Sequence, residues 1–234
     1  MDFADRRQVG KVPGNSQKST LEMMAKASTC FFCGKLGRMG YDFFVDLQYD
    51  LARSAETVRK YSAAGRICQY HLWQLASMAS PLDLAPTLAA IARETAERWQ
   101  ARGGNSEKHI KQRGLSSSPK GCCLVCTFIQ RSETRLARDF QKILATQNGR
   151  AAYEQSLGFC VRHTALVASR MDTKIAAFIL DHARKRFSEL SQDLQAFSAK
   201  SASQRRGPLE SVEKTIFSRA LVQLAGNRHF TNPC

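Results

Sequence analysis

The sequence predicts an all-α protein with two tandem helical repeats, each clamped by a Cys₃His metal site, and a C-terminal helix. Three observations favour this fold class. A pattern of Cys-x-x-Cys, a gap of 33 or 34 residues, and Cys-x-x-His occurs twice in the chain. Apolar residues recur at helical spacing between these motifs. The alternating apolar and polar pattern of β-strands is nearly absent from the 234 residues.

The repeated pattern supplies two complete sets of candidate metal ligands. The first copy consists of Cys30, Cys33, Cys68 and His71, and the second of Cys123, Cys126, Cys160 and His163. Their Cys-x-x-Cys elements start 93 residues apart and their Cys-x-x-His elements 92 residues apart. Two sets in nearly the same register indicate an internal duplication.

The composition of the stretches between the motifs divides the chain into five segments. In order, we expect a flexible arm at 1–27, a metal-binding repeat at 28–101, a basic flexible linker at 102–121, a second metal-binding repeat at 122–197, and a polar linker with a C-terminal helix at 198–234. The linker assignments depend on Gly, Ser and basic residues, which favour irregular structure.

Helices are expected in a regular order within this frame. A first helix covers 41–61, where apolar residues have mostly helical spacing. Before it, the glycines of 34–40 predict a loop that separates Cys33 from that helix. A second helix begins after Gly65 and carries Cys68 and His71. A third begins at Pro81 or Pro86, and the last covers 211–225.

Each ligand set has the composition of a structural zinc site, because three cysteines and one histidine close a four-coordinate shell. If each Cys-x-x-Cys pair opens a helix, the positive helix end lowers the pKa of its thiols. Iron–sulfur clusters, in which histidine can replace a cysteine, are the main alternative. Thiol redox chemistry and buried cysteines without a cofactor are further alternatives. Assembly of each site within one copy is the simpler arrangement, and it is our prediction.

Composition restricts the class of protein further. The first 20 residues carry early charges and no apolar core, unlike a secretory signal, and no run is apolar enough to span a membrane. A cytoplasmic location is therefore expected, and in a reducing compartment paired cysteines favour metal binding over disulfides. The formal net charge of +15 falls to about +13 with either type of cofactor bound, which leaves anionic partners plausible.

The other residues capable of chemistry are expected to be structural or solvated. Cys122 is interpreted as a packing residue and Cys234 as a surface thiol, whereas three histidines are assigned to the surface or its boundary: His109, His182 and His229. Clusters of Lys and Arg are expected at the surface, with phosphate contact as the alternative: Lys108, Lys111, Arg113, Lys120, Arg184, Lys185, Arg186, Arg205 and Arg206. Asp42, Asp46 and Asp50 form a solvated acidic helix face.

The motifs also resemble an uncharacterised bacterial family of duplicated, cysteine-rich helical proteins. Its members carry CxxC and then GFCxxH, twice, and end in a helix before a glycine. The resemblance covers about residues 28–226, and the second copy has the GFC spelling at Gly158, Phe159 and Cys160. The first copy departs from it at 65–68, reading GRIC. This resemblance implies a helical fold and metal binding only, and it carries no inference about activity.

The function that follows from the sequence is a metal-binding interaction or accessory protein with a protein partner. An iron–sulfur protein for electron transfer, cluster handling or redox sensing is the leading alternative, and a zinc-dependent nucleic-acid binder is the third. Signatures of hydrolases, metalloproteases and phosphate-binding loops are missing from the sequence, so we lean against an enzyme.

Overall fold

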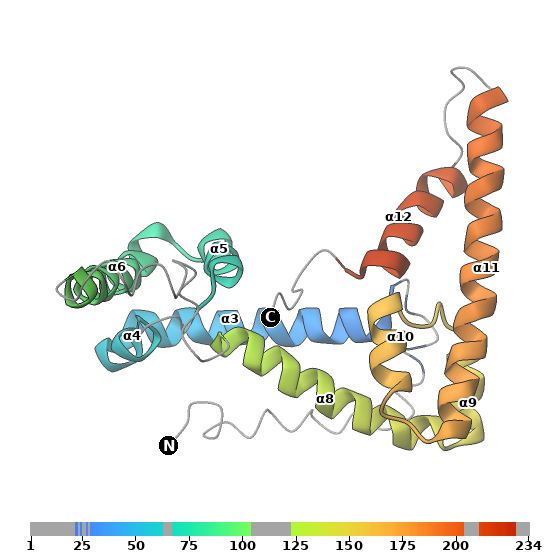
Figure 1. Ribbon diagram of the computed structural model, residues 1–234, viewed down its shortest axis with the longest axis horizontal. Helices are drawn as coiled ribbons and strands as arrows, with labels where there is room; N and C mark the ends of the chain where they lie inside the picture. Colours follow the sequence, from blue (N-terminus) through green and yellow to red (C-terminus); the bar gives the residue numbers. More distant parts are fainter. Residues whose placement is uncertain are drawn as a thin grey trace. The chain divides into compact units, whose positions relative to one another are not determined.

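Every regular element of the described chain is a helix, which confirms the all-α prediction (Figure 1). The computed structural model describes residues 22, 24, 27, 29–62, 67–103, 123–203 and 211–227. In order, its helices are α3 (Phe31–Arg53), α4 (Ala55–Ser62), α5 (Gln69–Met78), α6 (Pro81–Gly103), α8 (Leu124–Leu144), α9 (Gln147–Glu154), α10 (Val161–Ala168), α11 (Thr173–Ser203) and α12 (Ser211–Ala225). None of them is both long and apolar enough to cross a membrane.

The order of helices is the same in both halves of the described chain. A long helix that starts at a Cys-x-x-Cys pair is followed by an eight-residue helix, then by a short helix after Cys68 or Cys160, and then by another long helix. Thus α3, α4, α5 and α6 correspond to α8, α9, α10 and α11. The helix α12 follows these two sets and has the bounds expected from the sequence.

The chain divides into two compact units, and each combines parts of both sequence copies. Unit 1 consists of Met1–Gly37 and Ser132–Thr231, and unit 2 of Arg38–Arg131 and Asn232–Cys234. Unit 1 therefore holds the start of α3, most of α8, and α9 to α12. Unit 2 holds the rest of α3, the start of α8, and α4 to α6.

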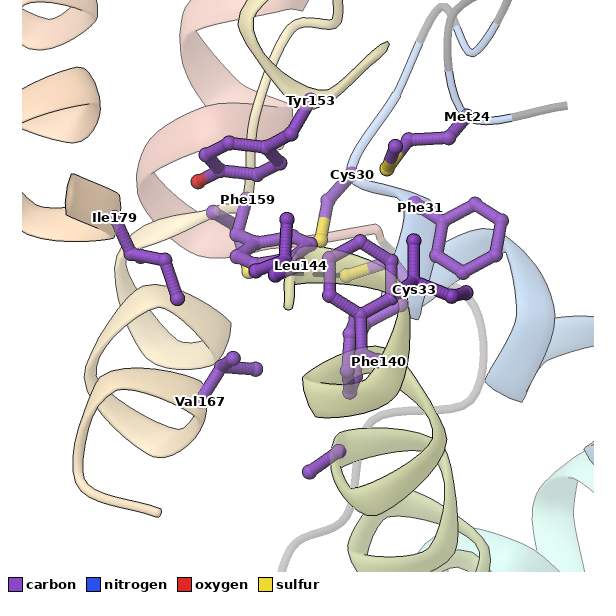
Figure 2. Close-up of a cluster of buried hydrophobic side chains, with 14 of the residues drawn as sticks. Met24, Cys30, Phe31, Cys33, Phe140, Leu144, Tyr153, Phe159, Val167 and Ile179 are labelled. Atoms are coloured by element: carbon purple, nitrogen blue, oxygen red, sulfur yellow. Dashed lines mark hydrogen bonds between the residues drawn. The ribbon is translucent and has the colours of Figure 1, made fainter. Parts of the chain in front are cut away.

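Aromatic residues form the core of unit 1, as Figure 2 shows. The ring of Phe140 from α8 lies 5.6 Å from Phe32 and 5.1 Å from Phe159, in edge-to-face arrangements. Tyr153 of α9 lies 5.0 Å from Phe159 on the other side. The cysteines Cys30, Cys33 and Cys160 belong to the same buried cluster. The helix α12 packs against α10 and α11 in this unit (Figure 1).

Unit 2 has its own buried residues at matching places. Leu47 and Tyr61 are almost fully buried, as are Phe140 and Tyr153, which stand at the equivalent positions of the second copy. The helix α4 packs against α6. The equal burial of residues 92 or 93 positions apart agrees with the duplication inferred from the sequence.

Several expected boundaries differ from the structure, and the helix expected over 41–61 is divided between α3 and α4. The glycines of 34–40 lie inside α3, because buried neighbours such as Leu36 and Phe44 stabilise the helix by packing and outweigh the low helical propensity of glycine. The helix α5 starts at Gln69, so Cys68 precedes it rather than lying within it. The helix α11 continues to Ser203, beyond the expected end of the repeat at 197. Pro81, as expected, is the first residue of α6.

Candidate metal centres

All four cysteine motifs have the same local geometry at the start of a helix. The carbonyl oxygen of the first cysteine accepts the first helical hydrogen bond, from the residue four positions on, at Cys30, Cys68, Cys123 and Cys160. The second ligand is then the third residue of the helix. In a capping box, side chains at these two positions lie close enough to meet. The spacing of three residues therefore aims both ligand atoms at one point in front of the helix.

Four helix starts meet in pairs and form two groups of ligands. Site 1 consists of Cys30, Cys33, Cys160 and His163, and site 2 of Cys68, His71, Cys123 and Cys126. In each group, the three sulfurs and one imidazole nitrogen all lie within 4.8 Å of one another. Site 1 lies in unit 1 and site 2 in unit 2.

The expected assembly of each site within one copy is wrong. Site 1 takes its Cys-x-x-Cys pair from the first copy and its Cys-x-x-His pair from the second, and site 2 takes the reverse combination. The physical reason is that α3 and α8 each continue well past their cysteines. Each long helix carries the chain away from its own pair before the Cys-x-x-His element arrives. The partner helix start is therefore supplied by the other copy.

In site 1, His163 presents Nδ1 to all three sulfurs. The distances from Nδ1 to Sγ are 3.1 Å for Cys160, 3.3 Å for Cys33 and 3.5 Å for Cys30. The sulfurs of Cys33 and Cys160 lie 3.8 Å apart. Cys30, Cys160 and His163 are at most 4% exposed, so the group is almost closed to water.

Site 2 repeats this arrangement with nearly the same distances. Nδ1 of His71 lies 3.2 Å from Sγ of Cys68, 3.3 Å from that of Cys126 and 3.6 Å from that of Cys123. The sulfurs of Cys68 and Cys126 are 3.9 Å apart. Cys68 is partly exposed, whereas the other three ligands are buried.

The electrostatics of site 1 favour a bound cation. Burial raises the pKa of the Cys30 thiol far above its ordinary value, and neighbouring sulfurs add to this effect. Hydrogen bonds from Cys30, Cys33 and His163 lower the pKa of Cys160. Burial alone lowers the pKa of His163, but hydrogen bonds with Cys160, Cys33 and Glu133 raise it to about 11. Without a metal, these shifts favour a Cys160 thiolate paired with a His163 imidazolium. A divalent cation would stabilise thiolates in the buried group.

In site 2, burial affects the pKa values of the ligands more than hydrogen bonding does. It lowers the pKa of His71 to about 4, which leaves the imidazole neutral and able to coordinate metal. Burial also raises the pKa of the Cys123 thiol, although backbone amides of Cys126, Cys68 and Val125 act in the opposite direction. The expected lowering by the helix start is therefore present at Cys123 but smaller than the effect of burial.

A buried carboxylate contacts the histidine of site 1 on the side away from the sulfurs, and it was not identified from the sequence. Glu133 of α8 accepts a hydrogen bond from Nε2 of His163, with 3.0 Å between Oε1 and Nε2. Arg162 holds the same carboxylate, with 3.1 Å between its Nη2 and Oε1. The exposed fraction of Glu133 is only 5%. In site 2, Nε2 of His71 is buried and has no hydrogen-bond partner among the described residues. The sequence does not distinguish Glu133 from other helical carboxylates, because the nearest ligand before it, Cys126, belongs to site 2.

The end of α12 covers site 1. Gly226 follows the helix with φ of +82°, and a Cβ added there would lie 3.5 Å from Sγ of Cys33 and 3.8 Å from that of Cys160. The backbone N–H of Asn227 points to Sγ of Cys33, with 3.5 Å between nitrogen and sulfur. Gly158, with φ of +70°, forms a sharp turn before Cys160. Glycine suits both turns because it adopts positive φ without strain.

Other residues singled out in the sequence lie apart from the two sites. His182 is half-buried, with its ring 4.6 Å from that of Tyr153, and burial lowers its pKa. Arg184 and Lys185 pair with Asp181. Arg186 pairs with Glu189, and Asp42, Asp46 and Asp50 lie on α3. The candidates outside the described residues are Cys122, Cys234, His109, His229, Lys108, Lys111, Arg113, Lys120, Arg205 and Arg206.

Together, the fold and the two groups define an all-helical protein with two sites suited to metal binding. No protein-family model matches the sequence, and no curated protein or solved structure shows significant similarity to it. The function is therefore inferred from the chain's own geometry.

Proposed function

We propose that this protein is a helical interaction or accessory protein in which each Cys₃His site holds one structural zinc ion. The observation that carries the proposal is the spacing of the ligand atoms. Sulfur ligands placed tetrahedrally at about 2.3 Å from one zinc ion lie about 3.8 Å from each other. The measured sulfur–sulfur distances of 3.8 and 3.9 Å agree with this spacing.

The same spacing argues against a four-iron cluster, which is one form of the iron–sulfur alternative. Each protein ligand of such a cluster binds a different iron. The ligand atoms therefore surround the whole cluster and lie farther apart than around a single ion. An upper separation of 4.8 Å in both groups favours one ion in each site.

A zinc ion in either site would join helices from both sequence copies. It would stabilise the fold because ligand binding and folding are coupled when the ligands come from distant parts of the chain. Such a closed site leaves no open position for a substrate. The proposed role of the metal is therefore to hold helices in place for a surface that binds another protein.

Exposed apolar side chains support the proposal that this protein binds another protein. In α12, Phe217, Leu221 and Leu224 have exposed fractions of 58%, 51% and 53% and share one helix face. In unit 2, Trp73 and Leu82 are 72% and 84% exposed. Neighbouring exposed apolar residues are typical of protein-binding surfaces. The described basic cluster at 184–186 is engaged by acidic neighbours, which gives less support to nucleic-acid binding.

The metal assignment is tested by measuring zinc, iron and acid-labile sulfide in protein purified without oxygen. We expect two zinc ions for each chain, no sulfide and no visible absorption band. Iron with a matching amount of sulfide would contradict the zinc proposal and favour iron–sulfur chemistry.

The interaction role requires a separate measurement. A partner that co-purifies with the wild type should be lost from Phe217→Lys, while this variant keeps both metal ions. Retention of the partner by this variant and by Trp73→Lys would contradict the assignment of these residues to the binding surface.

A further inference from the structure

The two sites differ at the outer nitrogen of their histidine. When Nδ1 binds a metal, Nε2 carries the proton and becomes a hydrogen-bond donor. At His163, this donor faces the buried carboxylate of Glu133 at 3.0 Å. At His71, which is 0% exposed, Nε2 has no partner among the described residues. Desolvation of a donor without a partner is unfavourable.

This difference arises at one pair of equivalent positions in the two sequence copies. Glu133 stands seven residues after Cys126, and the residue seven positions after Cys33 is Gly40. Because the sites are paired across the copies, Glu133 on α8 serves the histidine of site 1. Its counterpart on α3 lies in unit 2, together with site 2. Gly40 is buried and has no side chain that could reach His71.

One cysteine of site 2 is also more accessible to solvent than its counterpart in site 1. Cys160 is 1% exposed, whereas Cys68, its counterpart in the first copy, is partly exposed. A chelator can therefore approach a ligand of site 2 more easily than the matching ligand of site 1. In site 1, the backbone of Gly226 and Asn227 also lies against the sulfurs.

We propose that the two sites hold metal unequally, with Glu133 as the positioning residue that makes site 1 the retained site and site 2 the exchangeable one. This inference depends on the proposed function, because it assumes that both groups bind metal. A carboxylate on the outer nitrogen fixes the tautomer and ring orientation of a histidine ligand and makes it more basic. Loss of such a partner weakens metal binding by about 10–100-fold. Unit 2 is then the part of the protein whose folding depends on metal supply.

The inequality is tested by equilibrium competition between the full-length zinc protein and a chromogenic zinc chelator. We expect two dissociation constants that differ by about 10–100-fold. The two are assigned with variants that retain one site each. Cys68→Ser leaves only site 1 and should show the tighter constant, and Cys160→Ser leaves only site 2 and should show the weaker one.

The role of Glu133 is tested in the protein that carries Cys68→Ser. Adding Glu133→Ala should weaken zinc binding about 10–100-fold. Glu133→Gln should be less affected, because an amide oxygen can still accept the Nε2 proton. Asp139→Asn is the matched control, since Asp139 is exposed on the same helix. It should leave the constant unchanged. Circular dichroism of the zinc-loaded variants checks that each is folded.

A spectroscopic measurement separates positioning from general stability. In the ¹⁵N-labelled zinc protein, the Nε2 proton of His163 should resonate downfield and exchange slowly, and Glu133→Gln should shift it. Equal dissociation constants in the wild type, or a site 1 constant that Glu133→Ala leaves unchanged, would overturn the inference. If the purified protein holds no metal before the chelator is added, the proposed function itself is wrong.

Discussion

Site 1 and site 2 have the same ligands on the same helix positions, but they differ in the layer of residues behind the ligands. In both, three sulfurs face Nδ1 of a histidine at 3.1–3.6 Å. Behind His163 lies a carboxylate that Arg162 holds in place, and Nε2 of His71 has no described partner. The comparison teaches that a short motif places the same ligand atoms together in both sites, whereas residues outside the motif determine what lies behind the histidine.

The pairing of the half-sites gives the largest expected effect. Cys160→Ser combined with Cys30→Ser should lose one metal ion, because both residues belong to site 1. Cys160→Ser combined with Cys123→Ser should lose both ions, because the two residues belong to different sites. Metal analysis of the purified double variants checks this. If each site were assembled within one copy, the first double variant would lose both ions and the second would lose one.

The two eight-residue helices permit a second comparison. In α9, Thr146 caps the helix and accepts a hydrogen bond from the N–H of Gly149 at 3.0 Å. In α4, Ser54 caps the helix in the same way for Thr57 at 3.1 Å. A Cβ at Gly149 would lie 1.9 Å from the carbonyl oxygen of Ile143. We expect Gly149→Ala to lower the free energy of unfolding by about 2 kcal/mol or more, through backbone displacement.

The matched variant for this test is Thr57→Ala, which keeps the cap and introduces no clash. Its expected effect is within about 0.5 kcal/mol. Urea unfolding of both variants with zinc bound provides the measurement. An equal decrease in the free energy of unfolding for both variants would show that the backbone near α9 adjusts to the added Cβ without cost.

The smallest expected effect concerns the two glycines beside site 1. Gly226 has a positive φ, so Gly226→Ala should destabilise unit 1 by about 1–2 kcal/mol. Gly34 lies inside α3, and a Cβ there would meet only Oγ1 of Thr29 at 3.9 Å. Gly34→Ala should therefore be neutral or stabilising by up to about 1 kcal/mol. Thermal unfolding compares the two, and a larger loss for Gly34→Ala would contradict this account.

Local rules explain what could be predicted from the sequence. The eight candidate ligands follow from a spacing of three residues, which places the two side chains of each pair within a single helical turn. The start of α6 at Pro81 and the bounds of α12 follow from proline chemistry and amphipathic spacing. The fold class and the eight residues of the two groups could therefore be predicted from the sequence, whereas the division of these residues between the groups could not.

Features that depend on distant residues could not be predicted. Pairing Cys33 with Cys68 or with Cys160 satisfies the same local rule, so the choice depends on how far α3 extends. The glycines of 34–40 suggested a loop there, and packing of residues such as Leu47 overrode their low propensity. Glu133 looked like any helical carboxylate, because its role arises only when His163 lies beside it.

The exchange of half-sites has a consequence for the order in which the protein forms during synthesis. All ligands of site 2 lie between Cys68 and Cys126, inside the segment that site 1 closes from Cys30 to His163. A chain leaving the ribosome therefore presents a complete inner set while the outer set still lacks its second half. Because domains fold progressively from the N-terminus, the inner set would be the first able to bind a metal ion. An ion in the outer set would then close a loop around a segment whose own site is already complete.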